Sequence, residues 1–192
     1  MCIRDRDGES IEIKRIKAAY FEHFKKPYYA IQFSQNNESE YYDQDNRGLR
    51  RQFLKAPVKF SRISSRFTMK RFHPVQKRNK PHLGTDYAAQ RGTPIYSTAN
   101  GVITHGKYNR YNGNYVKVKH NSVYTTQYLH MSKIKRGIRP GKRVKQGDII
   151  GFVGSTGLAT GPHVCYRFWK NGRQVDPYKQ KLPKSKPIKV MT

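Results

Sequence analysis

The stretch GPHVCYRFW, residues 161–169, places an imidazole and a thiol two positions apart in a run of aromatic and branched side chains. Such a composition favours a β-strand, on which positions two apart point to the same face. The core face would then carry Val164, Tyr166 and Phe168. The opposite face would carry His163, Cys165, Arg167 and Trp169. This second face predicts a metal site, a nucleophile or a set of ordinary surface residues, and the strand alone does not choose between them.

Two further stretches carry side chains that bind metals or transfer protons. In PHLGTDYAA, His82 and Asp86 flank Gly84, and their even spacing lets both side chains reach one point while the glycine allows a close backbone approach. One nitrogen and one oxygen donor suit zinc. In QYLHMSK, His130 ends an aromatic-rich strand. A single histidine is more often structural than a ligand, so the signal lies in three clusters together.

The elements that must position these residues are short strands. From Ser61 onward, strand candidates alternate with glycine and asparagine turns, and no helical period of useful length follows residue 60. Asn100-Gly101 and Asn112-Gly113 are typical of hairpin turns, because both residue types tolerate a positive φ. The sequence therefore predicts an all-β, antiparallel, sheet-dominated domain.

Composition divides the chain into four parts. We expect a non-native or truncated leader (1–10), a small β ancillary segment with a connector (11–56), the main β domain (57–183) and a Pro- and Lys-rich basic tail (184–192). Within the second part, the polar run 36–46 is typical of a hairpin loop. The start of the chain lacks the regions of a secretory signal, so an export signal would have been lost with the true N-terminus. No apolar run approaches the roughly 18 residues that span a membrane.

The chain is strongly basic, with 39 Lys and Arg against 12 Asp and Glu, a net charge of +27. Such a field attracts polyanions, which leaves open a nucleic acid, an anionic cell envelope or a solvated surface without a specific partner. The charge is spread from Lys14 to Lys189, and no nucleic-acid-binding signature accompanies it, so we do not expect nucleic acid as the partner. Cys2 and Cys165 make no disulfide framework, and Cys165 is best treated as a lone thiol.

Most of residues 61–183 resembles the zinc endopeptidases of the lysostaphin and LytM type, within them the Gram-negative murein DD-endopeptidase branch. The matching pieces, in the family's order, are RISSRF, HPVQKRNKPHLGTDYAAQRGTPIYSTANGVI, YTTQYLHMSKI, GKRVKQGDIIGFVGSTGLATGPH and NGRQVDP. The resemblance implies a duplicated-hybrid-motif fold, in which an antiparallel sheet carries a groove with zinc (Zn²⁺) at its floor. It also implies a small β segment before the catalytic domain.

The resemblance also implies roles for single residues. His82 and Asp86 match the first two zinc ligands of the family, and the third ligand, the second histidine of a His-x-His strand, falls at Cys165. His130 and His163 match the histidines that assist catalysis without binding metal. The implied reaction is hydrolysis of a peptide bond in peptidoglycan stem-peptide cross-links, in this branch between D-alanine and meso-diaminopimelate. The implied location is the cell envelope, either periplasmic or membrane-anchored through a missing N-terminal segment.

Cys165 and Arg167 are the two departures from the family pattern. Cysteine is a good zinc ligand, but a thiolate in place of an imidazole lowers the charge of the site by one, and a less positive metal activates water less effectively. The family usually carries glutamate at position 167, so arginine there raises the local charge by two. We therefore expect Arg167 either to compensate the charge of Cys165 or to contact the substrate.

Four functions stay open. The first is a zinc hydrolase that uses His82, Asp86 and Cys165 with His130 and His163, and it is favoured because the rest of the constellation is intact. The second is a catalytically degenerate domain that binds peptidoglycan as an activator or scaffold. In the third, Cys165 is a nucleophile paired with His163, which is disfavoured because no third group orients the pair. The fourth is a basic nucleic-acid-binding domain.

Overall fold

The computed structural model describes residues 3–4, 10–11, 15–35, 38–59, 61–73 and 78–182. The chain forms two compact units: Phe53–Leu182, and a smaller one made of Met1–Gln52 with Pro183–Thr192. We propose that these units are separate domains, which agrees approximately with the boundary expected at residue 57. The predicted leader and basic tail fall outside the described residues except for residues 3, 4 and 10, and they stay predictions.

The described residues of the smaller unit form five strands, paired within two antiparallel sheets. They are β1 (Ile3–Arg4), β2 (Ser10–Ile11), β3 (Ala18–His23), β4 (Lys26–Gln35) and β5 (Glu38–Tyr42). Strands β3 and β4 form a hairpin through Phe24 and Lys25, which both have a positive φ. Strand β5 corrects the expectation of a loop over residues 36–46: the polar run pairs with β4 because Tyr42 supplies a buried side chain.

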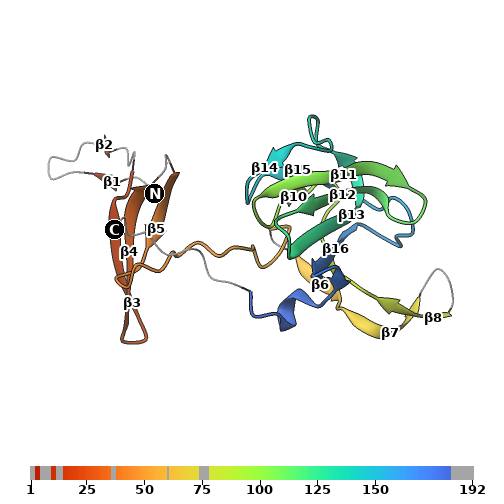
Figure 1. Cartoon of the computed structure of the whole chain (residues 1–192), viewed down its shortest axis with the longest axis horizontal. Helices are drawn as coiled ribbons and strands as arrows, with labels where there is room; N and C mark the ends of the chain where they lie inside the picture. The colour runs from red at the N-terminus through yellow and green to blue at the C-terminus, as the bar shows by residue number, and fades with distance from the viewer. Residues whose placement is uncertain are drawn as a thin grey trace. The chain divides into compact units, whose positions relative to one another are not determined.

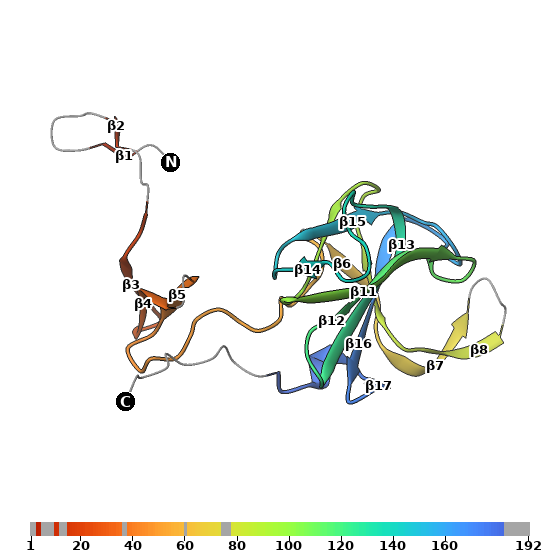
Figure 2. The same cartoon turned by 45° about the horizontal axis from the view of Figure 1, so that its top comes forward.

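The larger unit is built on one antiparallel sheet with the strand order β14-β11-β12-β13-β16-β9-β6. Two further strands, β7 and β8, form a hairpin that extends away from this sheet (Figures 1 and 2). The strands are β6 (Arg62–Ser65), β7 (Thr68–His73), β8 (Arg78–His82), β9 (Thr85–Ala88), β10 (Pro94–Tyr96), β11 (Gly101–Asn109), β12 (Gly113–Lys119), β13 (Tyr124–Ile134), β14 (Arg143–Val144), β15 (Ile149–Val153), β16 (His163–Lys170) and β17 (Arg173–Gln174). The all-β, antiparallel prediction is confirmed.

Strand β16 separates the core from the opposite face as its alternation predicts. Val164, Tyr166 and Phe168 are all buried in the main core. Each such side chain contributes roughly 1.5–3 kcal/mol when fully buried. Phe53, from the segment that precedes β6, packs its ring against Phe168 with centroids 5.2 Å apart. The core face of β16 therefore holds the connecting segment onto the domain.

The two asparagine–glycine turns differ. Asn112-Gly113 closes the β11–β12 hairpin, with Gly113 at φ 64°, so this prediction is confirmed. Asn100-Gly101 does not close a hairpin, and that prediction was wrong. It joins β10 to β11, which do not pair with each other: β10 pairs with β15, and β11 pairs with β12 and β14.

Helical structure contributes little to the described part of the chain. Its one helical element is η1, a 3-10 turn over Pro177–Lys179. Over the same residues, none of the structure is a helix of the length and apolar character needed to cross a membrane.

Candidate metal centre and active site

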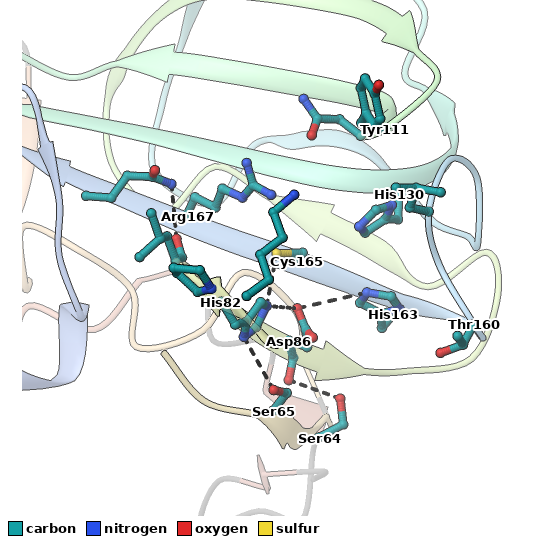
Figure 3. A pocket seen from close by; sticks show the side chains of 16 residues that line it. Ser64, Ser65, His82, Asp86, Tyr111, His130, Thr160, His163, Cys165 and Arg167 are labelled. Atoms are coloured by element: carbon teal, nitrogen blue, oxygen red, sulfur yellow. Dashed lines mark hydrogen bonds and ion pairs between the residues drawn. The ribbon is translucent and has the colours of Figure 1, made fainter. Parts of the chain in front are cut away.

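His82, Asp86 and Cys165 bring three donor atoms together at the floor of a groove of about 500 Å³ (Figure 3). Cys165 lies directly opposite Asp86 in the pairing of β16 with β9, and His82 ends the neighbouring β8. His82 Nε2 is 2.9 Å from Asp86 Oδ1 and 3.7 Å from Cys165 Sγ. All three residues are buried. The structure thus brings together the three residues that the sequence predicts as ligands.

The tautomer of His82 is fixed by the main chain. Its Nδ1 lies 3.0 Å from the carbonyl oxygen of Arg66, and a carbonyl only accepts, so Nδ1 carries the hydrogen. In a neutral ring, Nε2 is then an acceptor that faces the acceptor Oδ1 of Asp86. Two acceptors at 2.9 Å require a proton or a metal ion between them.

Gly84 makes the approach of β8 and β9 to β16 possible. A Cβ atom at this position would lie 2.9 Å from Cys165 Sγ, 3.0 Å from Arg167 Cγ and 3.1 Å from the carbonyl oxygen of Tyr166. These separations are shorter than van der Waals contact, and one of the neighbours is backbone. A side chain here would therefore push His82 and Asp86 away from the thiol.

The electrostatics of the cluster favour a bound cation. Burial alone would raise the pKa of Asp86, but the hydrogen bond and the charges of His82 and His163 lower it to about 2. Burial and the Asp86 carboxylate raise the pKa of the Cys165 thiol to about 12, which Arg167 offsets only in part. A metal ion that binds Cys165 would therefore have to displace the thiol proton.

The three donors fit zinc. A tetrahedral zinc ion with bonds of about 2.0–2.3 Å holds its donor atoms about 3.3–3.8 Å apart. Here the three donor atoms all lie within 4.8 Å of one another, so small movements would complete the site. Nitrogen, oxygen and sulfur are also the donors that zinc takes in proteins. Three protein ligands leave one position of a four-coordinate ion for water or substrate.

His130 and His163 lie beside this cluster, with ring centroids 4.8 Å apart (Figure 3). Each Nδ1 lies 2.8 Å from a main-chain carbonyl oxygen, of Thr156 for His130 and of Gly161 for His163. Each Nδ1 therefore donates, and each Nε2 remains for other partners. The Nε2 atom of His163 is 3.9 Å from Asp86 Oδ1. All three groove histidines thus share one arrangement, which leaves Nε2 as the chemically active atom.

His130 reaches the groove because β13 is irregular at that residue. Leu129 pairs with Cys165 and so lies on the same side of the sheet as Cys165, and regular alternation would send His130 to the core side. His130 instead has φ 63°, and the pairing of β13 with β12 shifts register nearby. Bulges and positive φ values re-aim side chains and are typical of functional sites.

The environment of His130 keeps its ring neutral. Burial lowers the pKa of His130 to about 4, and the charge of His163 adds to this, against the opposing hydrogen bond to Thr156. At neutral pH the ring is therefore uncharged and can accept a proton at Nε2.

The family assignment follows from comparison with known proteins. The profile of Peptidase family M23 matches residues 80–177, just over half of the 192 residues. The chain belongs to peptidase family M23. The match contains all five residues that the sequence analysis assigns to the metal and the catalytic histidines, so the resemblance to the lysostaphin and LytM type is confirmed.

Relatives and solved structures agree with the M23 assignment. Peptidoglycan DD-endopeptidase ShyC of Vibrio cholerae is 44% identical over 153 residues, which cover 80% of this chain and 35% of ShyC. A zinc-containing peptidase from Vibrio cholerae superposes with a TM-score of 0.64 at 40% identity, over 88% of this chain and 51% of that one. The catalytic domain of lysostaphin from Staphylococcus simulans gives 0.54 at 28% identity, over 62% of this chain and 90% of that domain.

The M23 chain spans about a third of the length of the curated relatives it matches. The relatives therefore contain regions that have no counterpart in these 192 residues.

Arg167 lies on the groove face of β16, as the alternation predicts. It lines the groove with the three donors and the two further histidines. Figure 3 shows it on the opposite side of Cys165 from His130 and His163. The structure thus gathers all six predicted site residues of this M23 domain around one groove.

Several groove residues were missed by the sequence analysis. Ser65 places its hydroxyl 3.3 Å from His82 Nδ1, beside the Arg66 carbonyl. Tyr111 and Thr160 line other parts of the same groove (Figure 3). The RISSRF stretch contributes to the family resemblance, but nothing in its spacing indicates which main-chain carbonyl faces a histidine.

Proposed function

We propose that this chain is the catalytic part of a zinc-dependent endopeptidase that hydrolyses peptide cross-links of bacterial peptidoglycan. The observation that carries the proposal is the convergence of three donor atoms within 4.8 Å of one another, at the floor of a groove that also presents His130 and His163. Membership of peptidase family M23 and the similarity to a peptidoglycan DD-endopeptidase support it.

His82, Asp86 and Cys165 would hold the zinc ion. When bound, zinc supplies a Lewis acid that polarises the peptide carbonyl and makes water a stronger nucleophile. Because Cys165 contributes a thiolate where the family has an imidazole, the donor set carries two negative charges. Such a set binds zinc firmly but leaves it less electrophilic.

His130 and His163 would move the protons. Each ring donates Nδ1–H to a main-chain carbonyl, so Nε2 is the atom that can accept a proton from the attacking water and pass it to the leaving amine nitrogen. His130 is neutral at pH 7 because burial lowers its pKa to about 4. The groove shields both rings from bulk water, which strengthens their hydrogen bonds to a developing oxyanion.

The proposed substrate is the stem-peptide cross-link between D-alanine and meso-diaminopimelate, and the proposed location is the cell envelope. The DD-endopeptidase name of the relatives supports the first point. The net charge of +27 suits a substrate that carries carboxylates.

Digestion of purified sacculi by zinc-loaded protein tests the proposal. We expect soluble glycan fragments that carry uncross-linked stem peptides, identified by mass spectrometry, and their release should stop with a chelator and with His82→Ala. His105→Ala is the matched control, because His105 lies outside the groove lining and should leave release unchanged.

Two outcomes would replace the proposal. Sedimentation with sacculi without cleavage of cross-links would favour the degenerate peptidoglycan-binding domain. Binding to duplex DNA at physiological salt as tight as binding to sacculi would favour a nucleic-acid-binding protein.

A further inference from the structure

Arg167 is a charged groove residue that the proposed mechanism does not use. It is half-buried on β16, two residues beyond Cys165. Its Nε is buried and has no hydrogen-bond partner among the described residues. None of the ion pairs found in the described part of the chain includes it. A guanidinium held this way has donors to offer to a ligand in the groove.

The position of Arg167 is fixed by close packing. A Cβ on Gly84 would lie 3.0 Å from Arg167 Cγ, so the backbone of Gly84 lies directly against the arginine stem. On the other side, Gln127 is its register partner in β13. The stem is therefore held, and the loss of side-chain entropy on binding a ligand is reduced.

The surroundings of Arg167 are cationic. Lys117 lies one strand further across the same face, paired with Gln127, and its Nζ sits 4.7 Å from the ring centroid of Trp169. Lys80 also lines the groove, whose lining contains a single carboxylate, that of Asp86, already bonded to His82. This end of the groove therefore attracts an anion.

The distance from the donor cluster selects which anion could bind. Two residues along a strand span roughly 6.7 Å, so Arg167 reaches a group close to a bond that lies over Cys165. In a D-alanine–meso-diaminopimelate link, the acyl-side carboxyl is consumed in the bond and its side chain is a methyl group. The free carboxylate next to the bond belongs to the amine-side residue.

We propose that Arg167 is a specificity-determining residue that binds the free carboxylate of the amine-side residue at the scissile bond. The planar guanidinium matches a carboxylate through paired hydrogen bonds. The inference rests on the proposed function, and it gives Arg167 a task in addition to its partial lowering of the pKa of the Cys165 thiol. The chain then discriminates against cross-links in which this carboxylate is amidated.

The test uses the full zinc-loaded chain and two synthetic cross-links that differ only in a carboxylate or carboxamide at this position. We expect wild type to prefer the carboxylate by roughly tenfold or more in kcat/KM, since hydrogen bonds between charged groups are the strong ones. Arg167→Gln should abolish the preference, chiefly through KM, and Arg167→Lys should restore part of it. Arg136→Gln removes an exposed positive charge outside the groove and should keep the preference.

Three results would overturn the inference. An unchanged preference in Arg167→Gln would show that the arginine does not read the carboxylate. An equal loss on both substrates would assign it a structural role. Loss of bound zinc in this variant would assign it to the charge of Cys165 instead.

A second readout separates this inference from the proposed function. NMR titration with a stem tripeptide ending in meso-diaminopimelate, and with its amidated form, needs no turnover. Wild type should bind the carboxylate form more tightly, and Arg167→Gln should bind both alike. If this holds while sacculi stay intact, the proposed hydrolysis fails and the carboxylate site stands. If wild type binds both forms alike, the carboxylate site fails.

Discussion

The two faces of β16 carry opposite chemistry although they alternate residue by residue. Tyr166 and Phe168 are 2% and 1% exposed in the main core. On the other face, Cys165 lies in the floor of the groove and His163 donates its Nδ1–H to the main-chain carbonyl oxygen of Gly161. The contrast teaches that one face supplies the stability of the strand and the other its chemistry. Substitutions should therefore separate folding from metal binding.

The largest expected effect on stability comes from a substitution on the core face of β16. Phe168→Ala removes a ring that packs on Phe53 and Tyr124 and should lower the free energy of unfolding by about 3–5 kcal/mol. Urea denaturation measures this loss. Trp169→Ala, the next residue on the groove face, is the control and should cost clearly less. Equal losses would contradict the separation of the two faces.

The next largest effect is expected from a substitution on the groove face, which should remove bound zinc. Cys165→Ala should abolish stoichiometric zinc and lower hydrolysis at least about a hundredfold, because even partners that only orient ligands contribute about 10–100-fold. Compared with zinc-free wild type, the variant should lose only roughly 1 kcal/mol of stability, because the stabilisation by bound zinc is absent from both proteins. Metal analysis and urea denaturation check the two halves. Zinc retained at one equivalent would exclude Cys165 as a ligand.

A smaller effect comes from a histidine on the core side. Burial lowers the pKa of His120 to about 4, below the ordinary value of about 6.5. As the pH falls from 7 to 4, the unfolded chain binds a proton that the folded chain does not. The free energy of unfolding should therefore fall, by up to roughly 2–3 kcal/mol at pH 4, while little changes above pH 7. Urea midpoints at pH 7, 5.5 and 4 measure it, and His120→Gln should make the fall clearly smaller, while the fall that comes from the lowered pKa of His130 remains. The same slope in both proteins would rule out His120 as its source.

The smallest expected effect comes from removing one hydroxyl group, that of Tyr128, from the core. The Tyr128 hydroxyl accepts hydrogen bonds from the Thr98 backbone N–H and from the Thr126 hydroxyl, both at 2.9 Å. Tyr128→Phe should cost about 1–2 kcal/mol of stability, since it leaves a buried donor unpaired. Zinc content and hydrolysis by the folded protein should not change. A fall in zinc content would show that the core network positions the groove.

Much of the fold could be predicted because it depends on alternation. The side chains of β16 separate into two faces as their period requires, and His82 and Asp86 meet as their even spacing allows. The prediction of a loop over residues 36–46 was wrong because most of these residues are polar, although β5 lies among them. The pairing of β5 with β4 depends on the buried Tyr42. Asn100-Gly101 misled because a turn dipeptide does not reveal which strands pair on either side of it.

The candidate site was less accessible from the residues alone. Regular alternation would put His130 in the core, and only the positive φ at this residue turns it into the groove. Its place could be expected from the family resemblance, not from the pattern. The carbonyl partners of the histidines could not be predicted, because every residue has a main-chain carbonyl and residue types do not show which of them lies next to a histidine.

The use of main-chain carbonyl oxygens as hydrogen-bond partners of the histidines affects how the sequence can evolve. The hydrogens on the three groove rings are positioned by the carbonyls of Arg66, Thr156 and Gly161, and any amino acid supplies a carbonyl. Side chains at positions 66 and 156 can drift without altering the protonation pattern of the imidazoles. A deletion in the segment around residue 66 or in the segment around residue 156 would move the carbonyl and misplace the histidine ring, although every motif residue would still be present. Loop length at these places, rather than the motifs alone, should distinguish working homologues from inactive ones.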